Sequence, residues 1–83
     1  MTQNADLARV LALFPERALG IREIFLKDES FRGICEDYGL ACDSLARFEA
    51  LPDARSRPEI AEYRSVIAEL EQEIAALLPV PAR

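Results

Sequence analysis

The sequence predicts an all-α protein, in which an antiparallel, coiled-coil-like helical hairpin follows one or two short N-terminal helices. Three observations predict this class. Ala, Leu, Glu and Arg, which favour helices, make up about half of the 83 residues. Strand signals are sparse, since Thr occurs once and Val three times. Two long stretches repeat apolar residues at alternating spacings of three and four. The length allows one small domain spanning residues 1–83.

The short N-terminal helices are expected within residues 4–27. The first covers about residues 5–13, with Asn4 as N-cap, and ends before Pro15 because proline disfavours helix at the residue before it. The second covers about residues 16–27, since Pro15 suits a first helical turn. Its apolar stripe consists of Ala18, Ile21 and Phe25. Residues 27–30 either break or only bend the chain before the next helix.

The first hairpin helix is expected within residues 28–51, beginning near Phe31, and Pro52 closes it. Gly33 and Gly39 lie in its interior and reduce its stability. Its apolar positions follow one heptad seam, made of Phe31, Ile34, Tyr38, Ala41, Leu45 and Phe48.

The second hairpin helix is expected over residues 58–78, and residues 79–83 form a tail. Ser56 and Glu59 have the spacing of a capping box, and Pro58 suits the first turn. The seam of this helix consists of Ile60, Tyr63, Ile67, Leu70, Ile74 and Leu77. Two seams of equal length joined by a short turn are typical of an antiparallel hairpin.

The apolar faces of both hairpin helices are wider than a two-stranded seam needs. Flanking apolar residues widen them, namely Cys35, Cys42, Leu51, Val66 and Leu78. Either the N-terminal helices fold back over the hairpin or a second chain covers it. Because so small a domain is marginally stable alone, we expect a homo-oligomer, either a dimer or a tetramer.

Several residues in this order resemble the YdcH-like family of small bacterial helical hairpins. They are Phe14-Pro15-Glu16, Ile21, Leu26-Lys27, Phe31, Tyr38, Arg47-Phe48-Glu49, Leu70, Glu73-Ile74 and Leu77. The resemblance covers residues 14–78 and implies a helical hairpin. It implies no activity, because that family has none established. The closing helix here carries five Glu and no Lys, unlike the Lys-rich helix of the family.

Composition argues against catalysis, metal binding and cofactors. The chain has no His, which removes the usual general base and the commonest metal ligand. It also lacks a glycine-rich phosphate loop and a nucleophile elbow. Cys35 and Cys42 lie seven residues apart on one helix, too far for a mutual disulfide, so we expect two buried thiols. An intermolecular disulfide is the alternative.

Charge and hydropathy bound the partners and the compartment. The net charge of −5 argues against a nucleic-acid partner. The longest apolar run has five residues, and no targeting segment is visible, so we expect no membrane partner and a cytoplasmic location. We expect the acidic Glu62, Glu69, Glu71 and Glu73 to be solvated, or to bind a basic partner. Arg55 and Arg57 are expected to be exposed turn residues.

The sequence therefore predicts a non-catalytic protein–protein interaction or oligomerisation module. The first short helix cannot be stable alone in water, so it must dock on its own chain, a sister chain or another protein. The expected interface comprises Leu7, Val10, Leu11, Phe14, Phe25, Phe31, Ile34, Leu45, Ile67, Leu70 and Ile74. The alternative is a regulator that contacts nucleic acid, or a complex bound to it, through Arg17, Arg22, Lys27 and Arg32. A small-ligand carrier ranks below both.

Overall fold

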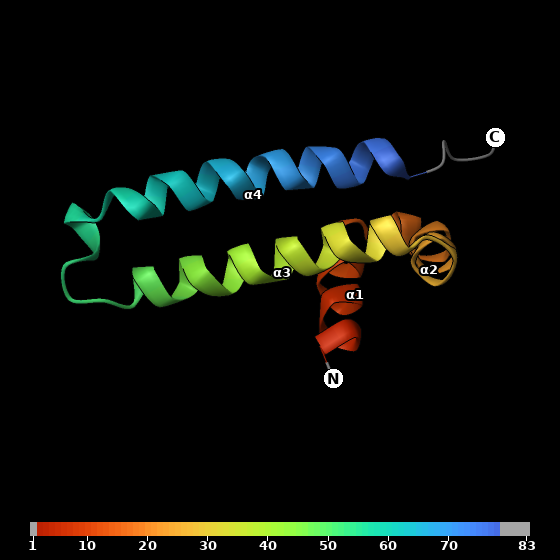
Figure 1. Cartoon of the computed structure of the whole chain (residues 1–83), viewed down its shortest axis with the longest axis horizontal. Coiled ribbons are helices and arrows are strands. Elements are labelled where there is room, and N and C mark those ends of the chain that lie inside the picture. The colour runs from red at the N-terminus through yellow and green to blue at the C-terminus, as the bar shows by residue number, and fades with distance from the viewer. Residues whose placement is uncertain (1, 79–83) are drawn as a thin grey trace.

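Four α-helices and two short 3₁₀ turns make up the structure, a computed structural model that describes residues 2–78 (Figure 1). The helices are α1 (Thr2–Leu13), α2 (Ala18–Lys27), α3 (Glu29–Glu49) and α4 (Pro58–Leu77). The 3₁₀ turns are η1 (Pro15–Arg17) and η2 (Ala54–Ser56). No strand occurs in residues 2–78, which confirms the all-α class for this part of the chain.

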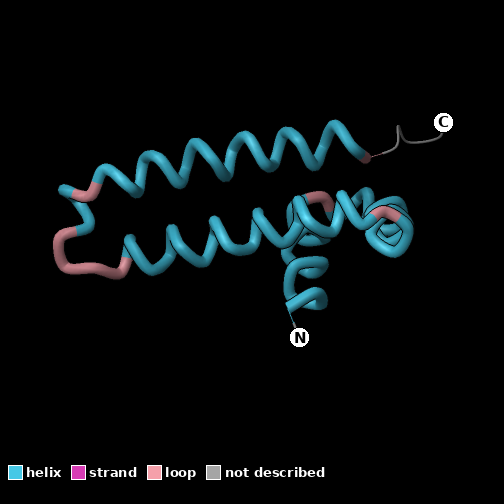
Figure 2. The backbone as a smooth tube through the Cα atoms, in the orientation of Figure 1, coloured by secondary structure: helices cyan, strands magenta, loops and turns pink. Residues whose placement is uncertain are grey.

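The two long helices, α3 and α4, lie side by side and run in opposite directions (Figure 1). The loop that joins them contains η2 and forms one end of the molecule, here called the turn end (Figure 2). At the other end, α2 lies across the start of α3, and α1 crosses beside α3. The N-terminal helices therefore contact only part of the α3–α4 pair.

The N-terminal boundaries differ from those predicted. α1 begins at Thr2, so Asn4 lies inside the helix and the predicted N-cap is wrong. The predicted second helix is divided, because Pro15 opens a 3₁₀ turn in which the Arg17 amide donates to the Phe14 carbonyl (3.0 Å). The Phe14 amide still donates to the Val10 carbonyl (3.2 Å), so η1 follows α1 directly.

A break separates α2 from α3 at Asp28, which settles the question left open by the sequence. Asp28 is extended (φ −119°, ψ 108°), and its carboxylate accepts a hydrogen bond from the Phe31 amide (3.2 Å). This caps the start of α3, two residues before the predicted Phe31. Arg32 closes the end of α2 by donating to the carbonyls of Phe25 (2.7 Å) and Leu26 (3.2 Å).

The predicted capping box at the start of α4 is wrong. The Ser56 hydroxyl donates to the carbonyl of Asp53 (3.0 Å), and no side chain caps the first turn of α4. The end of the predicted seam is also wrong. Leu77 is 42% exposed, whereas Leu78, the residue just after the helix, is buried. Leu78 leaves the helical path (ψ 141°), and its side chain joins the core.

Packing is uneven along the molecule. Every buried residue of α3 and α4 lies within residues 31–41 or at Ile74, beside the N-terminal helices. The core also includes Val10, Ile21, Phe25 and Leu78. Toward the turn end, the seam is only half-buried at Leu45, Phe48, Ile60, Tyr63, Ile67 and Leu70. The α3–α4 pair is thus well covered at one end and open at the other.

Candidate functional site

The predicted interface residues fall into two groups. Val10, Phe25, Phe31 and Ile74 are buried within a single chain. In this conformation they belong to the core of one chain, and their part in an interface stays a prediction. The other seven predicted residues are half-buried, namely Leu7, Leu11, Phe14, Ile34, Leu45, Ile67 and Leu70. Six of them, all except Leu45, pack against the core.

Helix α1 docks on α3 in its own chain, at a position that only glycine permits without rearrangement. A Cβ atom on Gly39 would lie 2.5 Å from Asp6 Oδ1 and 2.8 Å from an Arg9 guanidinium nitrogen. Arg9 in turn forms an ion pair with Asp43 on α3 (3.0 Å). Gly39 is buried, and the missing side chain leaves the space that Asp6 and Arg9 of α1 occupy. The sequence predicts that this glycine weakens the helix, but it does not show that the glycine makes room for α1.

Asp6 is a buried carboxyl at this crossing, only 8% exposed. Burial raises its pKa above the usual 3.8; the positive charge of Arg9 partly opposes this shift, and Asp43 adds to it. A carboxyl with a raised pKa stabilises the fold below pH 3.8, and this contribution is lost as pH rises through the pKa of the folded state.

Replacing Asp6 with asparagine should therefore change how stability depends on pH. As pH rises from 3 to 7, the free energy of unfolding of the natural chain should fall relative to that of Asp6→Asn, because only the natural chain must bury a newly formed charge. Urea unfolding of both proteins across this range measures the difference. A difference that is constant, or that grows in favour of the natural chain with pH, would contradict this account of Asp6.

The two cysteines are free thiols in different surroundings. Cys35 is fully buried, as predicted, whereas Cys42 is only half-buried. Burial, with the nearby charge of Asp6, raises the pKa of the Cys35 thiol to about 11. Because the thiolate is the reactive form, Cys35 is poorly suited to nucleophilic or redox chemistry.

Helix α2 presents two strongly exposed leucines, neither of which belongs to the interface predicted from the sequence. Leu19 is 74% exposed and Leu26 is 80% exposed. They lie seven residues apart, on the same side of the helix and about 10.5 Å apart along its axis. This side faces away from Ile21 and Phe25, which are buried in the core. The spacing of Ile21 and Phe25 identifies the buried side of this helix. Leu19 and Leu26 lie on the opposite side, so the sequence could have indicated that they are exposed.

A second apolar surface lies at the turn end, here called the turn-end groove. Phe48 and Tyr63 form its floor, with ring centroids 5.6 Å apart. Leu51 (36% exposed) and Val66 (43% exposed) form its walls. Arg47, Glu59 and Glu62 form its rim. Phe48 and Tyr63 are shared by two adjoining hollows of about 260 and 250 Å³.

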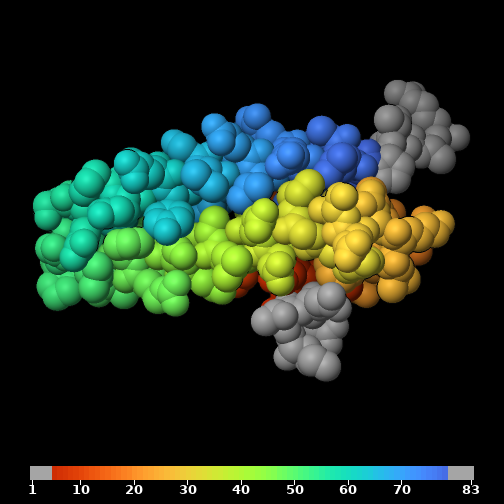
Figure 3. All heavy atoms as spheres, viewed as in Figure 1, coloured from red at the N-terminus to blue at the C-terminus, as the bar shows by residue number. Residues whose placement is uncertain are grey.

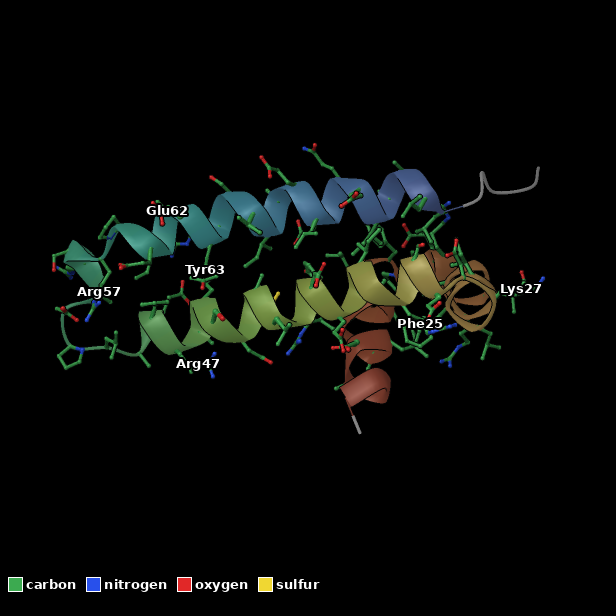
Figure 4. The ribbon with its side chains drawn as sticks, in the orientation of Figure 1. Phe25, Lys27, Arg47, Arg57, Glu62 and Tyr63 are labelled. Carbon is green, nitrogen blue, oxygen red and sulfur yellow. The ribbon has the colours of Figure 1, made fainter. Side chains whose placement is uncertain are left out.

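The figures place the labelled groove residues at the turn end. Arg47, Arg57, Glu62 and Tyr63 lie there, whereas Phe25 and Lys27 lie at the opposite end (Figure 4). On the face shown in Figure 3, atoms of α1 and α2 do not reach the green and cyan half near the turn. Arg57 is not the exposed turn residue that we predicted, because it is half-buried with its guanidinium over the Phe48 ring (5.9 Å).

The acidic residues of α4 have different environments. Glu69 and Glu73 are exposed, as predicted for a solvated face. Glu71 instead accepts a hydrogen bond from the buried Tyr38 hydroxyl (2.9 Å), which joins α3 to α4. Burial raises the pKa of Tyr38, and the hydrogen bond to Glu71 raises it further. Glu71 therefore satisfies a buried hydroxyl within the chain.

The basic residues considered for nucleic-acid contact do not form one surface. Arg32 is bound to the carbonyls at the end of α2, and Arg17 lies in η1. Arg22 and Lys27 are exposed on α2, beside the acidic Glu23. A shallow hollow of about 610 Å³ near Lys27 is lined by Glu23, Asp28 and Glu29 as well. These carboxylates oppose the concentration of positive charge that phosphate binding requires.

Two features found in other protein classes are missing from the described residues. Within residues 2–78, no three His, Cys, Asp or Glu side chains gather as metal ligands would. In the same part of the chain, no helix combines the length and the apolar character needed to cross a bilayer.

No protein-family model, curated protein or solved structure matches this chain. The resemblance to YdcH-like hairpins thus has no support beyond the residues that suggested it. The function of the chain is therefore inferred from its exposed surfaces.

Proposed function

We propose that this chain is a small, non-catalytic protein–protein interaction and oligomerisation module that works in the cytoplasm. Its scaffold is a coiled-coil-like hairpin of α3 and α4, held at one end by α1 and α2. One observation carries the proposal, namely the exposed pair Leu19 and Leu26 on α2. Two leucines at heptad spacing on one helix side are what an apolar helix–helix contact requires.

Exposure along the chain supports the same proposal. Leu19 and Leu26 are the most exposed of the large hydrophobic side chains in residues 5–78. Pairing of α2 with α2 of a second copy would bury the leucines in a closed, two-fold contact.

Self-association is tested by absolute mass. Light scattering on a sizing column, over a dilution series, should give a homo-oligomer for the natural chain. The double variant Leu19→Ser/Leu26→Ser should dissociate at concentrations about tenfold higher or more, because each lost leucine removes up to about 2 kcal/mol of burial. Both side chains are exposed in one chain, so circular dichroism should show unchanged helicity. A monomeric natural chain at all concentrations would refute oligomerisation.

A further inference from the structure

We propose that the turn-end groove binds an amphipathic helix of another protein, whose apolar side chains enter the groove and whose Lys or Arg side chains meet Glu59 and Glu62. This inference names a partner class for the interaction module, and it rests on that proposed function. It concerns a surface at the opposite end of the molecule from Leu19 and Leu26.

The groove is free of the chain's own N-terminal helices. α1 docks against Gly39 and pairs with Asp43, whereas Phe48 lies five residues further along α3. Among the described residues, none of α1 or α2 lines either hollow of the groove. The groove therefore lies along α3 beyond its contact with α1, where the seam residues stay half-buried.

The floor of the groove is held in place by contacts within the chain. Phe48 contacts Tyr63 across the pair and lies under the Arg57 guanidinium. Arg57 is itself held by Asp53, with 3.2 Å between Nε and Oδ2. Packed aromatic side chains flanked by exposed aliphatic walls resemble the anchor pockets that accept helices through residues spaced i, i+3, i+4 and i+7.

Charge on the rim selects a basic helix. Glu59 and Glu62 stand on the α4 side of the groove. Arg47 lines the other side, and Arg57, which lies over Phe48, is already paired with Asp53. One carboxylate oxygen of Glu59, Oε1, is shielded from solvent and has no hydrogen-bond donor within the described residues. A buried acceptor without a donor is costly, and a Lys or Arg of a partner would satisfy it. The net charge of −5 would also attract a basic partner from a distance.

A second copy of the chain is the less suitable occupant. Its most exposed apolar residues lie on α2, at the other end of the molecule from the groove. A contact from groove to α2 would be head-to-tail and would not close as a two-fold pair. A groove-to-groove contact would bring Glu59 and Glu62 of both copies to one interface without an excess of bases.

The test uses a fluorescein-labelled 14-residue peptide of Leu and Lys, with Leu at helical spacing, and anisotropy as the readout. A peptide of the same pattern with Glu in place of Lys is the charge control. The natural chain should bind only the Lys peptide. Glu59→Gln/Glu62→Gln should weaken binding about tenfold, equivalent to about 1.4 kcal/mol. Glu16→Gln/Glu36→Gln changes the net charge equally at exposed sites outside the groove and should weaken it less than twofold.

The apolar part of the proposal is tested with Leu51→Ser/Val66→Ser, which alters two exposed positions. It should also weaken peptide binding about tenfold, and amide shifts on peptide addition should concentrate in residues 44–51 and 59–66. Absence of binding, equal losses in both Glu→Gln variants, or shifts centred elsewhere would overturn the inference. So would conversion of a homo-oligomer into monomers by Leu51→Ser/Val66→Ser, since a second copy would then occupy the groove. Self-association through α2 would survive any of the first three results, so failure here leaves the proposed function standing.

Discussion

Replacing Phe31 with alanine is expected to remove about 4 kcal/mol from the free energy of unfolding. Phe31 is the largest fully buried side chain among the described residues, and it lies where α3 meets the N-terminal helices. Truncation of a buried Phe removes its transfer free energy and leaves a cavity that neighbours fill only in part. A domain of 83 residues is expected to have about 4–12 kcal/mol of stability, so this variant should lose between about a third and all of it.

Urea titration followed by circular dichroism measures this loss. Leu40→Ala is the matched control, because Leu40 lies on the same helix but is 60% exposed. Its effect should stay within about 0.5 kcal/mol. If Phe31→Ala cost less than ~1 kcal/mol, the packing of α3 against α1 and α2 would be wrong.

Opposite effects are expected when each of the two glycines of α3 is replaced with alanine. Gly33→Ala should stabilise the chain by up to about 1 kcal/mol, since alanine favours helix and nothing lies within 4 Å of the new Cβ. Gly39→Ala should destabilise it by about 1–2 kcal/mol, despite the same helical gain. The new methyl would collide with Asp6 and Arg9, of which the first is buried and the second is paired with Asp43.

Differential scanning calorimetry of both glycine variants checks the two signs. The Gly39 variant should also show faster hydrogen exchange in α1, because the collision pushes that helix from α3. Stabilisation of similar size in both variants would mean that α1 does not dock at Gly39. Such a result would leave the α3–α4 pair intact but remove the account of how its N-terminal cover is held.

Apolar periodicity predicts the helical class here, because residues buried on one side of a helix recur at the helical spacing. It identifies Phe31, Tyr38 and Ile74 as inward-facing, and the structure buries all three. It fails where chemistry competes with pattern. Leu77 continues the seam by spacing, yet the chain leaves the helix after it and buries Leu78 instead.

The contacts between distant elements could not be predicted in the same way. From the sequence alone, Gly39 is only a weak helix former. The structure shows that α1 crosses α3 at this residue. Ser56 and Glu59 fit a capping box, but the turn directs the Ser56 hydroxyl to Asp53. Among the candidate surface residues, spacing alone cannot tell which apolar face another helix covers. Spacing therefore does not separate Val10 and Phe25, which the chain itself buries, from Leu19 and Leu26, which it leaves exposed.

The central claim is that the chain is tightly packed where its N-terminal helices lie and open at the turn-end groove. Native-state hydrogen exchange, read amide by amide, tests it most directly. Protection is predicted to be highest around residues 31–41 of α3 and to fall steadily toward residues 44–49, with a matching fall along α4 from Ile74 to Tyr63. Equally strong protection along the whole of α3 and α4 would contradict the claim, because the groove would then be covered.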